Sequence, residues 1–250
     1  MIKKVRSASL IFTLSVFLVP SITFAQEKIT AAVAANYINP FKEIAIAFEA
    51  KTGIKVEATF SSTGNLYNQI TNGAPYDIFL SADEQRPELL LKNGTAEKPF
   101  VYAKGEVVLW SAKKNFCGEK NWKVQLAKSD IKKISIANPV TAPYGTAAKA
   151  ALEKAEMIKS IESKIVTAQD IAQVFQYASS EAVDAGFCAM SAALSEEGKK
   201  GCYYIVKEAP AVIQSACVLK KNKNPEASKK FAEFLVSPDA LKIKKKYGYK

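Results

Sequence analysis

ITAAVAANYINPFKEIAIAFEAKTGIKVEATF (residues 29–60) contains a complete strand–helix–strand unit. The apolar run at residues 29–34 predicts a buried strand, and residues 40–52 repeat apolar side chains at helical spacing until Gly53 ends the helix. Residues 55–60 predict a second strand. Two strands joined through a helix are typical of a parallel β-sheet, so this stretch places the chain among the α/β proteins.

The same alternation of strands and helices continues to the end of the chain. Further strands are predicted at residues 77–80, 133–136, 164–166 and 185–189, and further helices at residues 65–71, 87–92, 143–156, 169–178, 225–236 and 238–246. Two longer apolar runs, residues 100–112 and 212–220, predict strands that pass between two lobes. We therefore expect residues 26–105 and 220–250 to form a first lobe and residues 106–219 a second.

The first 25 residues have the pattern of an export signal. Lys3, Lys4 and Arg6 precede the apolar run at residues 10–18, and small residues follow up to Ala25. The run is shorter than the ~20 residues that span a bilayer, so a cleaved signal peptide is favoured over a membrane anchor. We expect cleavage after Ala25 and a mature protein in the periplasm.

Composition excludes several kinds of chemistry. The chain has no histidine, which removes histidine-based zinc sites, Ser-His-Asp triads and Cys-His dyads together. The formal net charge is +11, but the lysines are scattered except for a tail cluster at Lys242, Lys244, Lys245 and Lys246. We interpret that cluster as the solvated side of a helix. For an exported protein we expect no nucleic-acid partner.

Four cysteines are compatible with disulfide bonds in an oxidising compartment. Cys202 and Cys217 flank one short segment and are the first pair we predict, with four free thiols as the alternative. Cys188 lies within the apolar run AGFCAM, so we expect it to be a buried, unpaired side chain. Cys117 is left without a predicted partner.

Small polar residues follow the predicted strands, where α/β proteins bind ligands at helix N-termini. These junctions are Ala35-Asn36-Tyr37, Ser61 to Asn65, Ser81-Ala82-Asp83, Asn138-Pro139 with Ala142 to Gly145, and Thr167 to Ile171. They contain hydroxyl and amide groups and no lysine or arginine. Neutral donors at helix starts can hold a buried anion, although serine and asparagine are also common N-caps. The residues alone predict an anion or a small polar ligand in a cleft.

Three segments resemble the periplasmic molybdate-binding proteins of ABC importers. They are residues 32–90, residues 134–152 (ISIANPVTAPYGTAAKAAL) and residues 237–249 (SPDALKIKKKYGY), with TNGAPYDIFLSAD and NPVTAPYG as the specific motifs. The resemblance implies a two-lobed periplasmic binding protein fold, with crossing strands as the hinge. It implies molybdate or tungstate as cargo, no cofactor, a membrane permease as partner, and a monomer.

Site residues are implied by position in the same resemblance. Asn36 corresponds to the first side-chain ligand and the Ser62-Thr63 pair to the second, with either residue as the donor. Tyr144 and Ile171 correspond to donors of backbone amides. Ala189 stands where many members have a tyrosine hydroxyl, and Asn36 is the donor that would replace it.

Other functions remain as alternatives. Sulfate, thiosulfate or phosphate could occupy such a cleft, although protonated phosphate needs an acceptor, and we expect the nearby Asp83 and Asp170 to cap helices instead. An enzyme without histidine would need a Ser-Lys pair or two carboxylates. Ser62 has no lysine in its own junction, so we expect a binding protein and no catalytic residues.

Overall fold

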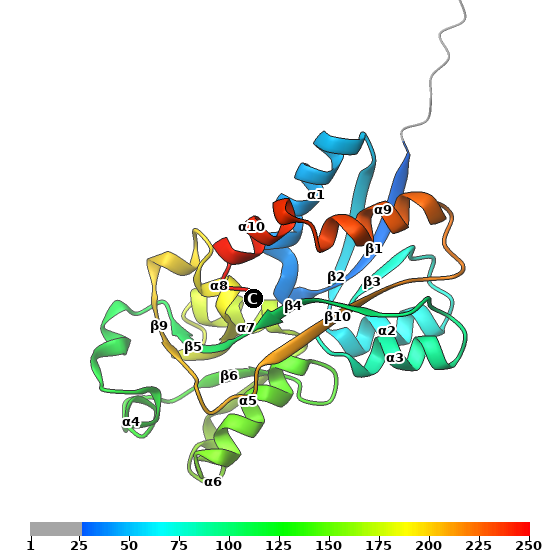
Figure 1. Cartoon of the computed structure of the whole chain (residues 1–250). Helices are drawn as coiled ribbons and strands as arrows, with labels where there is room; N and C mark the ends of the chain where they lie inside the picture. Colours follow the sequence, from blue (N-terminus) through cyan, green and yellow to red (C-terminus); the bar gives the residue numbers. More distant parts are fainter. Residues whose placement is uncertain (1–26) are drawn as a thin grey trace, which may run out of the picture.

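The computed structural model describes residues 27–250, which form two α/β lobes around two five-stranded sheets (Figure 1). The two-lobed α/β architecture predicted from the sequence is therefore confirmed. The predicted signal peptide, residues 1–25, lies outside the described residues. Between residues 27 and 250 no helix combines the length and the apolar character needed to cross a membrane.

The first sheet has the strand order β2-β1-β3-β10-β4. Its strands are β1 (Lys28–Ala34), β2 (Lys55–Ser61), β3 (Ile78–Leu80), β4 (Phe100–Gly105) and β10 (Val212–Val218). β1 runs parallel to β2 and β3, whereas β10 is antiparallel to β3 and β4. The carboxyl ends of β1, β2 and β3 consequently lie at one edge of the sheet.

The second sheet has the order β7-β6-β8-β5-β9. Its strands are β5 (Val107–Ser111), β6 (Ile134–Ala137), β7 (Ile165–Ala168), β8 (Ala185–Ala189) and β9 (Cys202–Ile205). β6 is parallel to β7 and β8, and β5 is antiparallel to β8 and β9. Each sheet thus combines a parallel half with an antiparallel pair.

The chain passes between the sheets twice. β4 ends at Gly105 and β5 begins at Val107, so the predicted single strand at residues 100–112 is two strands in different sheets. The chain returns to the first sheet before Val212, because β10 pairs with β3 and β4 of that sheet. The assignment of residues 212–219 to the second lobe was therefore wrong. In Figure 1 the paired strands β4 and β10 run together from one lobe toward the other.

Helices cover both sheets. Those of the first lobe are η1 (Ala35–Tyr37), α1 (Ile38–Thr52), α2 (Thr63–Thr71), α3 (Gln85–Lys92), α9 (Pro225–Leu235) and α10 (Pro238–Lys246). Those of the second are η2 (Lys114–Gly118), α4 (Trp122–Leu126), α5 (Pro143–Lys154), α6 (Ile158–Ile161), η3 (Glu162–Lys164), α7 (Ile171–Ser179), α8 (Met190–Ala193) and η4 (Gly198–Lys200). Aromatic packing joins α1 to α9, where the rings of Phe48 and Phe231 lie 5.1 Å apart.

One lysine of the tail cluster is not solvated. Lys244 is buried, and its ammonium donates to the carbonyls of Tyr102 at 2.6 Å and Leu235 at 2.9 Å. Burial lowers the pKa of Lys244. The prediction that all four lysines face solvent was wrong at this residue, because its side chain reaches two carbonyl oxygens in the interior. Lys246, in contrast, is exposed and pairs with Glu43 at 2.7 Å.

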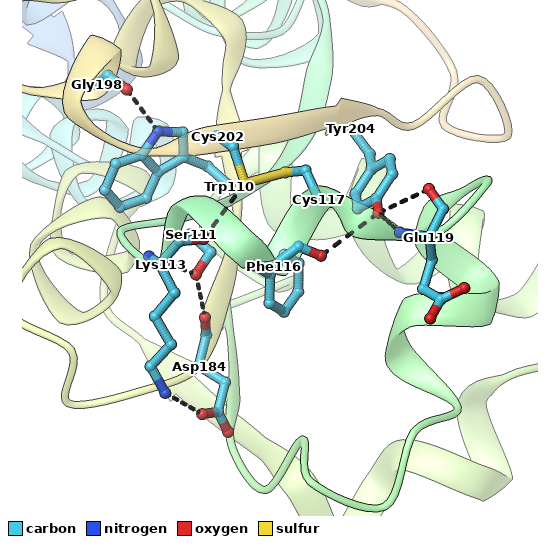
Figure 2. Close-up of a disulfide and its surroundings, with 10 residues drawn as sticks. All are labelled: Trp110, Ser111, Lys113, Phe116, Cys117, Glu119, Asp184, Gly198, Cys202 and Tyr204. Carbon is cyan, nitrogen blue, oxygen red and sulfur yellow. Dashed lines mark hydrogen bonds and ion pairs between the residues drawn. A yellow bond between two sulfur atoms is a disulfide. The ribbon is translucent and has the colours of Figure 1, made fainter.

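The disulfide joins Cys117 of η2 to Cys202 of β9 (Figure 2). The predicted Cys202–Cys217 pair was wrong, because the chain crosses between the lobes after Cys202 and Cys217 lies buried in β10 of the first sheet. Cys188 is buried and free, as predicted. Next to the disulfide, the amide of Glu119 donates to the hydroxyl of Tyr204 at 3.0 Å, so covalent and polar contacts hold η2 against the edge strand.

Removing this disulfide should destabilise the protein. The bond closes a loop with a sequence separation of 85 residues. Because disulfides typically contribute about 2–4 kcal/mol, we expect Cys117→Ser and Cys202→Ser each to lose about that much in urea unfolding under oxidising conditions. A reductant should destabilise the wild type by a similar amount and leave Cys117→Ser unchanged. A further loss in Cys117→Ser on reduction would mean that another cysteine pair forms.

Candidate functional site

A tight cavity with an accessible volume of about 10 Å³ lies between the lobes. All five residues that the sequence predicted as ligands line it, namely Asn36, Ser62, Thr63, Tyr144 and Ile171. Alanine and proline side chains and Asp170 complete the wall, from Ala34, Ala35, Ala82, Ala142 and Pro143. The structure therefore brings the predicted residues together from the carboxyl ends of strands in both sheets.

The second lobe contributes two helix starts. At α5, the amides of Gly145 and Thr146 both donate to the carbonyl of Ala142, at 2.8 and 3.1 Å, and Pro143 has no N–H. At α7, Asp170 caps the amides of Ala172 and Gln173, as predicted. Within residues 27–250, these bonds leave the amides of Tyr144 and Ile171 without an acceptor. Both are the amides that the resemblance implied as donors.

The first lobe contributes hydroxyl groups at the start of α2. Ser62 Oγ accepts from the amide of Asn65 at 3.4 Å, and Thr63 Oγ1 accepts from the amide of Ala82 at 3.0 Å. A hydroxyl that accepts one hydrogen bond still has its own hydrogen to donate. Ser62 and Thr63 can therefore both donate to a ligand, so the structure leaves both alternatives open.

Thr63 also offers a backbone donor that the sequence analysis missed. The three amides that follow it are all used: Gly64 donates to Thr141, Asn65 to Ser62 Oγ and Leu66 to the Ser62 carbonyl. In the described chain the Thr63 N–H has no acceptor, which is usual for the first turn of a helix. The N-cap position of Ser62 was the sequence signal that could have identified it.

Asn36 is bonded differently from the other predicted ligands. Its Nδ2 donates to Gln214 Oε1 at 2.8 Å and to the hydroxyl of Tyr249 at 2.9 Å. A side-chain amide has only two N–H hydrogens. Both are therefore used inside the protein, and in this arrangement Asn36 has no side-chain donor left for a ligand.

Asp83, Arg86 and Ala189 do not line the cavity. Asp83 accepts hydrogen bonds from the amide and the guanidinium of Arg86, so Asp83 fixes the first turn of α3 as expected and Arg86 is paired. Ala189 is buried at the end of β8 and borders a neighbouring groove, not the cavity. The sequence analysis expected Asn36 to supply the donor that Ala189 lacks. In the observed hydrogen bonds Asn36 does not do so, because both of its N–H hydrogens are used inside the protein.

Direct hydrogen bonds hold the two lobes together around the cavity. The amide of Gly64 donates to Thr141 O at 2.8 Å, and Arg86 Nη2 donates to Val140 O at 3.0 Å. On the opposite side Ser191 Oγ donates to the carbonyl of Asn36 at 2.7 Å. The lobes are therefore closed on each other.

Two α/β lobes, crossing strands and a closed cavity lined by helix starts define a two-lobed solute-binding protein. The sequence pattern of the bacterial extracellular solute-binding protein family matches residues 29–250, and the chain belongs to that family. The resemblance found in its motifs is confirmed by overall similarity to the molybdate-binding protein ModA of Rhodobacter capsulatus. The two are 38% identical over 229 residues, which cover 90% of this chain and 89% of the relative.

Two further comparisons agree. The structure of the Azotobacter vinelandii periplasmic molybdate-binding protein superposes with a TM-score of 0.84 at 31% identity, covering 89% of this chain and 98% of that one. A putative ABC transporter substrate-binding lipoprotein, YvgL of Bacillus subtilis, is 29% identical over 238 residues, which cover 92% of this chain and 89% of the relative.

The contact between Gly64 and Thr141 provides a test of closure. A Cβ at Gly64 would lie 2.9 Å from the Cα of Thr141 and 3.0 Å from its carbonyl oxygen. Gly64→Ala should therefore oppose closure while leaving α2 intact, because alanine favours helices. Overpacking of about 1–3 kcal/mol predicts roughly 5- to 150-fold weaker anion binding in isothermal titration.

A matched control lies on the same helix. Asn68 is exposed, so Asn68→Ala changes helix propensity without touching the other lobe. It should keep wild-type affinity and, in urea unfolding without anion, wild-type stability. Wild-type affinity in Gly64→Ala would show that binding does not need this closed contact.

Proposed function

We propose that this protein binds molybdate or tungstate in the interlobe cavity and delivers it to the membrane permease of an ABC importer. The observation that carries the proposal is a shell of neutral donors with hydrogens still free. They are the amides of Thr63, Tyr144 and Ile171 and the hydroxyls of Ser62 and Thr63. The relatives named above as molybdate-binding proteins support the choice of anion.

The charge of the ligand follows from this shell. Three of the donors are amides at helix starts, where the aligned peptide dipoles place partial positive charge. Hydrogen bonds to a charged acceptor are stronger than neutral ones, so a dianion can be held without a lysine or arginine. Among the described residues Asp170 is the only carboxylate that lines the cavity, and one of its oxygens caps α7. A fully ionised oxyanion suits such a site better than one that carries a proton.

The same proposal includes the compartment, the oligomeric state and the partner of the protein. The protein works in the periplasm after removal of residues 1–25, as a monomer, without a cofactor and without catalytic activity. The molybdate is cargo, held through its oxygens by protein donors. The similarity to YvgL, which is named as a putative ABC transporter substrate-binding lipoprotein, supports the permease as the partner.

Ligand-induced stabilisation tests the choice of anion. At a hundred times its dissociation constant, a ligand adds about 2.7 kcal/mol to the free energy of unfolding. For a chain of this size that raises the melting temperature by roughly 5–11 °C. We expect this shift with molybdate and tungstate and little shift with phosphate in thermal denaturation. An equal shift with phosphate, or a larger one with sulfate, would favour a binder of those anions.

Two variants at the first-lobe edge test the donors. Ser62→Ala removes one hydrogen bond to a charged acceptor, worth about 1.5–3 kcal/mol, and should weaken binding roughly tenfold to hundredfold. Asn36→Asp keeps the size but places a carboxylate beside the anion, and in the described chain no lysine or arginine lines the cavity. Its affinity, measured by isothermal titration, should fall well beyond that of Ser62→Ala. Near-wild-type affinity in both variants would place the anion elsewhere.

A further inference from the structure

A buried polar network surrounds the side chain of Asn36. Gln214 of β10 is fully buried, and its Oε1 accepts from Asn36 Nδ2 at 2.8 Å and from the Tyr102 hydroxyl at 3.1 Å. Its Nε2 donates to the hydroxyl of Tyr144 at 3.4 Å. Tyr144 belongs to the second lobe, whereas Asn36, Tyr102 and Gln214 belong to the first. Gln214 therefore touches both the cavity residue Asn36 and the helix that presents the Tyr144 amide.

The observed orientation of the two amides conflicts with anion binding. Because Gln214 directs its oxygen toward Asn36, Asn36 must direct its nitrogen toward Gln214. Within residues 27–250 the carbonyl oxygen of the Asn36 side chain has no donor, and Asn36 lines the cavity. A carbonyl oxygen beside a dianion is repulsive, while an N–H in its place would be a donor.

A joint rotation of both amides removes this conflict. After rotation, Gln214 Nε2 donates to Asn36 Oδ1 and to the Tyr102 hydroxyl, which itself donates to Ser81 O at 3.3 Å. Tyr144 then donates to Gln214 Oε1 across the same contact. Tyrosine hydroxyls can both donate and accept, so each pair only exchanges roles. Rotation of one amide alone would place two oxygens or two N–H groups against each other.

Tyr249 adapts to the same rotation. Its hydroxyl accepts from Asn36 Nδ2 and donates to the backbone carbonyl of Asn36 at 2.9 Å. After rotation it donates to Asn36 Oδ1 instead. The backbone carbonyl keeps the hydrogen bond from Ser191 at 2.7 Å. Both oxygens of Asn36 are therefore satisfied in the rotated network.

We propose that Gln214 is the positioning residue of the anion site, and that the anion selects the state in which the Gln214 and Asn36 amides are both reversed. In that state Asn36 Nδ2 faces the cavity and donates to the anion. Since one of the partners of Gln214 is in the second lobe, the reversal also makes Tyr144 a donor across the lobe interface. The inference rests on the proposed function, because it needs an anion in this cavity.

The orientation of Gln214 can be measured directly in the wild-type protein. With assigned side-chain amide resonances, the Gln214 Nε2 protons should show nuclear Overhauser contacts to the ring of Tyr144 without anion. With saturating molybdate these contacts should move to the ring of Tyr102. Unchanged contacts in a protein that binds molybdate would overturn the inference and leave the proposed function intact. Absence of molybdate binding by the wild type would overturn both.

Substitutions at Gln214 provide a second test. An ionised Glu in Gln214→Glu can only accept from Asn36, so at a pH where it is ionised it holds Asn36 Nδ2 away from the anion and should weaken molybdate binding a hundredfold or more. Gln214→Met cannot donate and accepts only weakly through its sulfur, so it leaves Asn36 free to turn and should weaken binding about tenfold or less. Equal losses in the two variants would overturn the inference.

A double-mutant cycle separates orientation from charge. If Gln214→Glu acts through Asn36, its effect should shrink at least tenfold in an Asn36→Ala background. Repulsion between the introduced carboxylate and the anion alone would give the same factor in both backgrounds, and that result would contradict the proposal. The resonance experiment uses only the wild type, so it decides the question even where Gln214→Glu does not fold.

Discussion

The two passages of the chain between its sheets determine the arrangement of everything else. Only Glu106 separates β4 from β5, and the return segment lies between Ile205 and Val212. Two short connections hold the sheets with the carboxyl ends of their parallel strands facing each other. Helix starts from both lobes then point at one space, and ligands of α/β proteins bind at such strand ends. The lobes can separate only by bending at these two segments.

The sequence predicted most of the elements, and the residues that line the cavity, where local pattern decides them. Apolar runs and helical spacing located all six strands of the parallel halves, and the family resemblance implied Tyr144 and Ile171, whose amides lack acceptors in the described chain. The misses depend on long-range contacts. The residues around β10 do not show which sheet this strand joins. The residues around Cys202 do not show which distant cysteine it bonds to. The short strand β9 was missed, because it carries tyrosines at a sheet edge without a buried apolar run.

Asn36 shows most clearly which property of the site could not be predicted from the sequence. Its position in the cavity was predicted from the motif, but the direction of its amide depends on Gln214, which is 178 residues away. An asparagine can present a donor or an acceptor with almost the same shape, and only its neighbours decide which. Hydroxyls such as Ser62 and Thr63 have no such ambiguity, because they accept from the backbone and still donate outward. The site therefore combines fixed donors with one whose character is set by the interior.

The disulfide has a consequence for solubility. β9 is the outermost strand of the second sheet, so one of its sides has no neighbouring strand in the described chain. Open strand edges can pair with another molecule and start aggregation. Cys202 opens β9, and its bond to Cys117 places η2 beside this edge. In an oxidising compartment the bond therefore ties this edge strand to its own lobe, and reduction would leave β9 freer to pair with another molecule even if the fold persisted.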